Sequence, residues 1–201
     1  MSGLLRKLLL STLIAAAPVT APWRHWTETD SETLWTVRYI NCDYGFYVLL
    51  AQGIVAHSTH APSPNHGFLI SLSDLGKTAP SSHQTEKRYI WVDASYDSSD
   101  DQSREAASSE TMTELKLSNP SRVRRTSARL AGLRAIEATA DDSDVDGGAL
   151  EETVVAIRSG IVYTVGLRTT KSDRAADEKQ FNRIVSGLKL LRLPSGECSN
   201  G

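Results

Sequence analysis

The strongest constraint on the fold is a pair of β-rich runs joined by a two-residue turn. Residues 150–158 read LEETVVAIR, residues 161–169 read IVYTVGLRT, and Ser159 and Gly160 separate them. Two such runs around a short turn that contains Gly are typical of a β-hairpin. Since an isolated hairpin is only marginally stable in water, we expect this one to belong to a larger antiparallel sheet.

Four further segments, all on the N-terminal side of this hairpin, are strand candidates. Residues 36–50 contain two stretches of β-branched and aromatic residues, and residues 67–72 form a short apolar run. Residues 88–96 alternate between two sets of side chains, which indicates a strand with one wetter face. Residues 128–140 alternate in the same way after a break at Gly132.

Two helices are predicted. Residues 103–117 are rich in Ala, Glu, Ser, Met and Leu, which favour a helix. Thr170 and Asp173 match a capping box. Apolar residues follow at helical spacing, namely Phe181, Ile184, Val185 and Leu188. Hairpins with helices between and after them predict an α+β domain, with a mainly antiparallel sheet flanked by helices in an α/β/α sandwich.

The first 21 residues have the features of a secretory signal peptide. Two basic residues precede an apolar run from Leu8 to Ala17, and small residues precede Pro22. This run is shorter than the roughly 20 residues that span a bilayer, and no later segment is long and apolar enough, so no membrane span is predicted. We expect the mature protein in the periplasm or outside the cell.

The remaining chain has the length of one domain. We expect a flexible N-terminal arm at residues 22–36, whose later part docks on the domain, a single domain at 37–194 and a C-terminal tail at 195–201. Without residues 1–21 the chain carries 20 Lys and Arg against 24 Asp and Glu. This balance argues against a nucleic-acid partner.

Only two cysteines are present, Cys42 and Cys198. In an oxidising compartment an isolated pair is most simply a disulfide. We therefore predict a Cys42–Cys198 bond, which would tie the two ends of the domain together.

The second half of the chain resembles the PsbP-like superfamily, whose prototype is an extrinsic subunit of photosystem II. The resemblance rests on LAGLRAIEATA, VVAIRSGIVYTVGLRT and FNRIVSGLKL, and on Tyr163, Phe181 and Ile184 within them. YGFYVLLAQG is similar to the opening strand of the family. The resemblance covers about two fifths of the chain and implies an antiparallel sheet sandwiched by helices. It also implies an accessory, assembly or inhibitory binding protein, since exported bacterial relatives include immunity proteins against toxins.

These observations predict a non-enzymatic protein that binds another protein of the cell envelope and needs no cofactor. Aromatic side chains dominate protein interfaces. The predicted contacts are therefore Trp23, Trp26, Tyr89 and Trp91.

A first alternative is a metal-dependent hydrolase. His57, His60 and His66 lie within ten residues and supply the three nitrogen donors of a catalytic zinc site. The segment between them contains Pro62 and Pro64, which stiffen it in an extended form and tend to separate the donors.

A second alternative is a calcium-stabilised module. Asp142, Asp144 and Asp146, followed by Gly147, match the first half of an EF-hand-type calcium loop. The bidentate Glu of such a loop would fall on Thr153. The bland alternative is a solvated acidic turn, in which Asp and Gly are common for backbone reasons.

Overall fold

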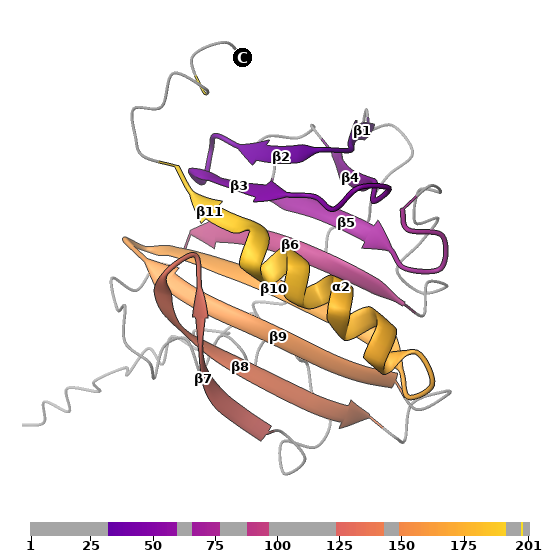
Figure 1. Cartoon of the computed structure of the whole chain (residues 1–201). Helices are drawn as coiled ribbons and strands as arrows, with labels where there is room; N and C mark the ends of the chain where they lie inside the picture. Colours follow the sequence, from indigo (N-terminus) through magenta and orange to yellow (C-terminus); the bar gives the residue numbers. More distant parts are fainter. Residues whose placement is uncertain are drawn as a thin grey trace, which may run out of the picture.

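The computed structural model describes residues 32–59, 66–76, 88–96, 124–142, 149–191 and 198. This part of the chain forms two antiparallel sheets and one helix (Figure 1). The strands are β1 (Glu32–Trp35), β2 (Arg38–Asn41), β3 (Phe46–Leu49), β4 (Ala56–Thr59), β5 (Gly67–Ser71), β6 (Tyr89–Tyr96), β7 (Arg124–Leu130), β8 (Leu133–Asp142), β9 (Ala149–Arg158), β10 (Ile161–Thr170) and β11 (Leu188–Leu190), and the helix is α2 (Arg174–Gly187).

The larger sheet has eight strands in the order β1-β4-β5-β6-β10-β9-β8-β7. Its centre is the predicted hairpin of β9 and β10, which pair in register from Ile161↔Arg158 to Thr170↔Ala149. Ser159 and Gly160 both adopt positive φ, at 53° and 71°. Two such residues form the type I′ turn that matches the twist of a hairpin, so this sequence prediction is confirmed.

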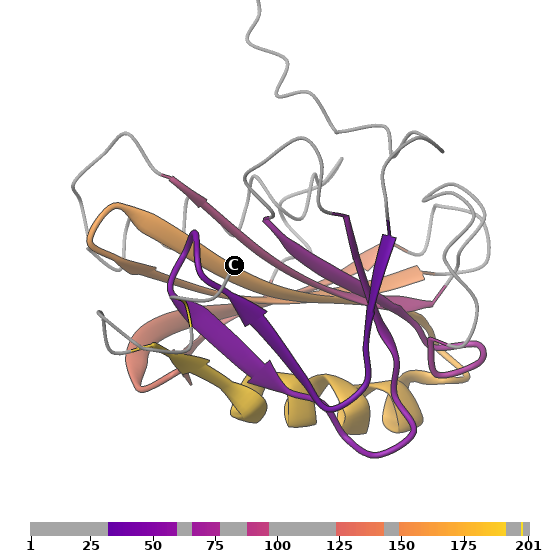
Figure 2. The same cartoon turned by 90° about the horizontal axis from the view of Figure 1, so that it is seen from above.

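A smaller sheet of β11, β3 and β2 lies with α2 over one face of the larger sheet (Figures 1 and 2). The main core fills the space between these layers. Alternate residues of β6, β9 and β10 point into it, and Tyr39, Phe46, Phe181 and Ile184 meet them from the smaller sheet and the helix. Ile136, Val155, Ile157 and Val162 are buried on the opposite face of the larger sheet.

A buried ion pair fastens α2 to the larger sheet. Asp177, 2 % exposed, accepts hydrogen bonds from Arg88 Nε at 2.9 Å and Nη2 at 2.7 Å. Thr169 Oγ1 at the end of β10 also donates to Asp177. Just before the helix, Asp173 N donates to Thr170 Oγ1 and Thr170 Oγ1 donates to the Asp173 carboxylate. The N-cap of α2 is Asp173, whose side chain makes no capping hydrogen bond, so the predicted capping box does not start the helix.

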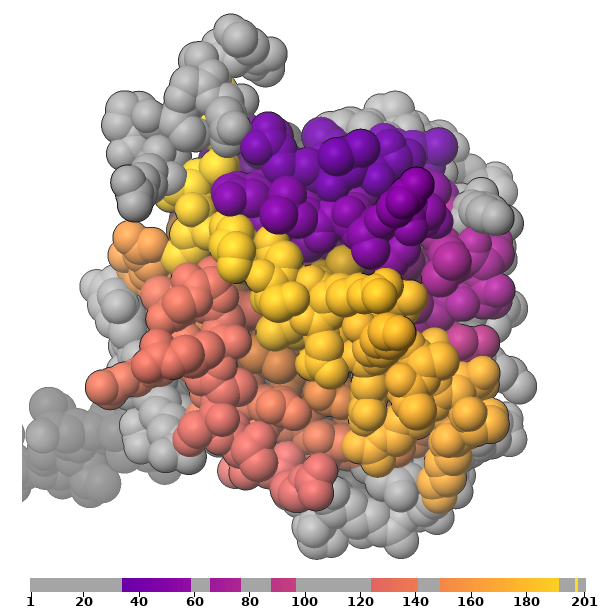
Figure 3. All heavy atoms as spheres, viewed as in Figure 1, coloured from indigo at the N-terminus to yellow at the C-terminus, as the bar shows by residue number. Residues whose placement is uncertain are grey.

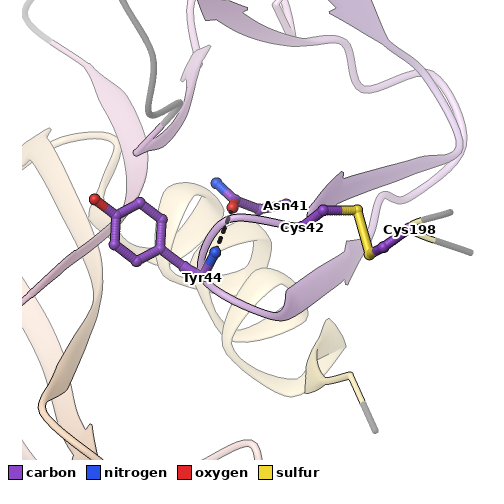
Figure 4. Close-up of a disulfide and its surroundings, with 4 residues drawn as sticks. All are labelled: Asn41, Cys42, Tyr44 and Cys198. Atoms are coloured by element: carbon purple, nitrogen blue, oxygen red, sulfur yellow. Dashed lines mark hydrogen bonds between the residues drawn. A yellow bond between two sulfur atoms is a disulfide. The ribbon is translucent and has the colours of Figure 1, made fainter. Parts of the chain in front are cut away.

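The predicted disulfide is confirmed: Cys42 is bonded to Cys198, with their Cα atoms 5.5 Å apart (Figure 4). Cys42 lies in the turn between β2 and β3, where Tyr44 N donates to Asn41 Oδ1 at 2.9 Å. Leu191 N donates to Gly45 O at 2.8 Å. The bond therefore joins the end of the chain to a turn that is already held by hydrogen bonds.

One expectation needs correction. The described residues contain one helix, on one face of the sheet, so this part is richer in β-structure than an α/β/α sandwich. The predicted helix at 103–117 lies outside the described residues. Residues 32–35, in the later part of the expected arm, form β1, where Trp35 Nε1 donates to Ser58 Oγ at 2.8 Å. The bounds of the arm stay a prediction. Within the described ranges, no helix is long and apolar enough to cross a membrane.

Candidate functional site

Tyr89 and Trp91 lie half-buried on the face of the larger sheet opposite α2, while Trp23 and Trp26 lie outside the described residues. The ring centroids of Tyr89 and Trp91 are 5.6 Å apart. The Trp91 indole lies against Gly166 of β10, where an added Cβ would meet ring atom Cζ2 at 2.0 Å. Burial raises the pKa of the Tyr89 hydroxyl. Both side chains therefore contribute to packing, and their role as partner contacts stays a prediction.

Gly166→Ala is expected to destabilise the protein by about 1–3 kcal/mol, because the new methyl group must displace the Trp91 ring. Urea unfolding measures the loss. The control is the same substitution in a Trp91→Ala background, where the obstructing ring is absent and the cost should fall below about 0.5 kcal/mol. An equal cost in both backgrounds would show that the strain lies elsewhere.

Two of the three predicted metal ligands, His57 and His66, form hydrogen bonds with backbone carbonyl groups. His57, 3 % exposed, places Nε2 2.5 Å from Gly76 O. His66 Nδ1 lies 2.7 Å from Ala94 O and 3.1 Å from the Tyr44 hydroxyl. His60 lies outside the described residues. These bonds orient His57 and His66 within the sheet, and a shared metal remains a prediction.

The predicted calcium loop is largely outside the described part of the chain. Asp142 is the last residue of β8, and Asp144 and Asp146 fall in the gap before β9. Among the residues that the structure describes, no three His, Cys, Asp or Glu side chains are grouped so that they could hold a metal ion.

The outward side of the smaller sheet presents a mixed apolar and basic surface, which we call the β2–β3 face. The strand register places Arg38 beside Leu49, Ile40 beside Tyr47 and Lys189 beside Tyr47. Tyr39, Phe46 and Val48, which alternate with these residues, are buried in the core. The β2–β3 face therefore consists of Arg38, Ile40, Tyr47, Leu49 and Lys189, with Val37 adjoining.

Two apolar side chains of this face, Val37 and Leu49, are exposed to solvent. Val37 is 74 % and Leu49 is 50 % exposed, and Leu34, three residues before Val37, is 60 % exposed. Leu50 N donates to Val37 O at 2.9 Å, which holds the two segments side by side. β2 and β3 form part of the surface in Figure 3. Val37 and Leu49 are thus two of the five large apolar side chains that are exposed in the described residues.

Two cations border these apolar side chains. Arg38 Cζ lies 5.6 Å from the centroid of the Tyr47 ring, an arrangement that orients the guanidinium over the aromatic face. Lys189 Nζ donates to Ser186 O at 2.8 Å, at the end of α2. The surface thus combines exposed aliphatic groups, an aromatic ring and positive charge.

A buried carboxyl group lies beneath α2 at the other end of the molecule. Glu152 of β9 is 7 % exposed and shares its side of the sheet with Val154 and Ala156. Burial, followed by the nearby Glu137 and Glu178, raises the pKa of Glu152 to about 7, although Arg174 opposes the shift. Glu152 is therefore largely protonated in mildly acidic solution.

Ionisation of Glu152 gives the protein a defined pH dependence. Because its pKa is about 7 in the folded protein and 4.5 otherwise, its stabilising effect is complete below pH 4.5 and is lost as pH rises through 7. Between pH 5 and pH 8 we expect a loss of about 2 kcal/mol, reduced from the full shift by solvent screening. The measurement is urea unfolding at both pH values.

Glu152→Gln should remove this loss of stability. Glu151→Gln is the matched control, because Glu151 lies on the other face and pairs with Arg168 at 2.8 Å, and this variant should keep the loss. If wild type and Glu152→Gln lost the same stability between pH 5 and pH 8, the assignment to Glu152 would be wrong.

A shallow hollow of about 520 Å³ opens along the exposed side of α2. Its lining consists of Ala175, Glu178, Lys179, Asn182, Arg183 and Ser186. None of the site residues predicted from the sequence borders it.

No family model matches this chain, and no curated protein matches it. Solved structures similar to it include the Ran-binding protein Mog1p of Saccharomyces cerevisiae, with 7 % identity and a TM-score of 0.47 over 81 % of this chain and 97 % of that one. Cyanobacterial PsbP of Synechocystis sp. PCC 6803 has 14 % identity and a TM-score of 0.44, over 84 % of this chain and 99 % of that one.

A structure from Bacteroides thetaiotaomicron has 7 % identity and a TM-score of 0.44 over 80 % of this chain, which spans half the length of that protein. These likenesses concern the arrangement of the chain and carry no function to it.

Proposed function

We propose that this chain is an exported accessory protein that binds another protein of the cell envelope through the β2–β3 face. The observation that carries the proposal is the exposure of Val37 and Leu49 beside Arg38 and Lys189. Exposed aliphatic groups next to one another favour removal from water by a partner.

The composition of the face defines the partner. Burial of Val37 and Leu49 calls for an apolar contact surface, and Arg38 and Lys189 at its border call for carboxylates around that surface. Leu49 is registered opposite Arg38, so the apolar and charged contacts lie within one interface. The partner is therefore a protein with an apolar patch bordered by acidic residues.

Export is supported by two features. The first 21 residues have the pattern of a signal peptide. The Cys42–Cys198 disulfide is of the kind that persists in oxidising compartments outside the cytoplasm.

Co-purification from the envelope fraction of cells that make this protein tests the proposal. Tagged wild type and an Ala176→Glu variant, altered on the exposed side of α2, should recover the same partner protein. Leu49→Glu should lose it, because a buried carboxylate in an apolar contact is strongly unfavourable. Recovery of the same partner by Leu49→Glu at wild-type yield would contradict the proposal.

A further inference from the structure

Strand β7 ends the larger sheet with an open edge. It is the last strand in the sheet order and pairs with β8 from Arg124↔Thr139 to Leu130↔Leu133 (Figure 1). Across the described residues, β7 has no strand partner on its other side. Its first four residues are exposed, so the edge is accessible.

Hairpin geometry shows which backbone groups this edge offers. Ala131 and Gly132, with φ of 51° and 83°, form a two-residue turn, so the flanking pair Leu130↔Leu133 is hydrogen-bonded. Hydrogen-bonded and non-hydrogen-bonded pairs alternate along an antiparallel ladder. Arg125, Ser127 and Arg129 therefore direct their N–H and C=O groups outward, where they can pair with an added strand.

Arginines surround the open edge. Arg125 and Arg129 lie on one face of β7 and Arg124 on the other, and Arg134 of β8 is directly opposite Arg129. None of these four arginines forms an ion pair with any residue in the described ranges. Glu137 of β8 accepts a hydrogen bond from Thr126 of β7 at 3.5 Å. The edge is thus basic in a chain whose net charge is −2.

The positive charge of the β7 edge indicates which kind of partner can bind there. A second copy pairing through the same strand would bring arginines opposite arginines, which is unfavourable. A nucleic acid would use the arginines but leave the row of outward N–H and C=O groups unpaired. An extended acidic peptide satisfies both, because its backbone extends the ladder and alternate carboxylates meet Arg125 and Arg129 on one face of β7.

We propose that β7 binds an extended acidic segment of a protein partner as an added antiparallel or parallel strand, at a site separate from the β2–β3 face. This interaction does not depend on the function proposed above, since the two surfaces lie on different sheets.

The probe is a synthetic capped peptide of seven residues in which Glu and Val alternate, and calorimetry on the full chain measures its binding. The peptide with Lys in place of Glu should bind at least tenfold more weakly. So should the acidic peptide with alternate backbone amides N-methylated, because methylation removes the ladder hydrogen bonds. Equal binding of the methylated peptide would overturn strand addition.

Variants of the protein provide the second part of the test. Arg125→Glu with Arg129→Glu should weaken the acidic peptide at least tenfold, and Ser127→Pro should do so by removing one outward N–H. Lys179→Glu on α2 is the control of matched charge type and should change binding less than twofold. Thermal melting checks that each variant folds. If Ser127→Pro does not fold, the peptide series and the double Arg variant still test the proposal.

Three further results would overturn the proposal: no binding of the acidic peptide, equal weakening by Lys179→Glu, or tighter binding of a single-stranded oligonucleotide than of the peptide. The first is expected if the arginines only protect the edge from aggregation.

Discussion

Replacement of the Cys42–Cys198 disulfide by Cys42→Ser and Cys198→Ser is expected to lower the free energy of unfolding by as much as about 5 kcal/mol. The two residues are 156 positions apart, and a cross-link that closes so long a loop strongly restricts the unfolded chain. This figure is an upper value, because residual structure in the unfolded state reduces it. Denaturation with guanidinium chloride measures the change.

The same experiment checks the mechanism. Wild type in a reducing agent should match the double Ser variant, since both lack the bond. In both, the free energy of unfolding should fall more steeply with denaturant concentration than in the oxidised protein, because their unfolded chains expose more surface. A loss below about 1 kcal/mol would mean that the bond contributes little to the stability of the domain.

Arg88→Ala is expected to cost about 3–5 kcal/mol, because it leaves the buried Asp177 carboxylate without its cation. Asp177 is 2 % exposed and Arg88 contacts it through two nitrogen atoms. After the substitution, the hydrogen bond from Thr169 Oγ1 still compensates part of the Asp177 charge. Urea unfolding measures the loss, which includes weaker attachment of α2.

Two controls separate this effect from a general loss of charge. Arg168→Ala breaks the more exposed Arg168–Glu151 pair, whose side chains are 31 % and 18 % exposed, and should cost no more than about 1 kcal/mol. Arg88→Met combined with Asp177→Leu should recover most of the stability lost in Arg88→Ala, because no unpaired charge remains. If the double variant were as unstable as Arg88→Ala, packing rather than charge would explain the cost.

Local features of the fold were predictable from the sequence. The β-rich runs around Ser159 and Gly160 specify a hairpin by themselves, since turn and strands are adjacent in the chain. The same holds for α2, which the helical spacing of Phe181, Ile184 and Val185 indicates. The disulfide was predictable because Cys42 has one possible partner in the chain.

Long-range features were not predictable, because no local pattern specifies them. β6 pairs with β10 across a large separation in sequence, and β11 joins β3. The two-sheet arrangement follows from these pairings, as does the Arg88–Asp177 contact between residues 89 positions apart.

The candidate site was missed for a related reason. Sequence reasoning favoured aromatic residues as contacts, yet Tyr89 and Trp91 are half-buried, whereas Val37 and Leu49 are exposed. The alternation of β2 and β3, with Tyr39 and Val48 on one side and Arg38 and Leu49 on the other, is the signal that points to this face. The alternation alone does not show which side of the two strands packs against the larger sheet, so the exposed side could not be identified from the sequence.

The most direct test of the proposed binding surface is site-specific photo-crosslinking in cells that make this protein. A benzophenone side chain is placed in turn at position 49 on the β2–β3 face, at position 91 on the opposite side of the larger sheet and at position 176 on α2. We predict that position 49 gives a cross-link to one envelope protein, and that positions 91 and 176 do not. Cross-linking of a partner from position 91 or 176, with none from position 49, would contradict a partner-binding role for the β2–β3 face.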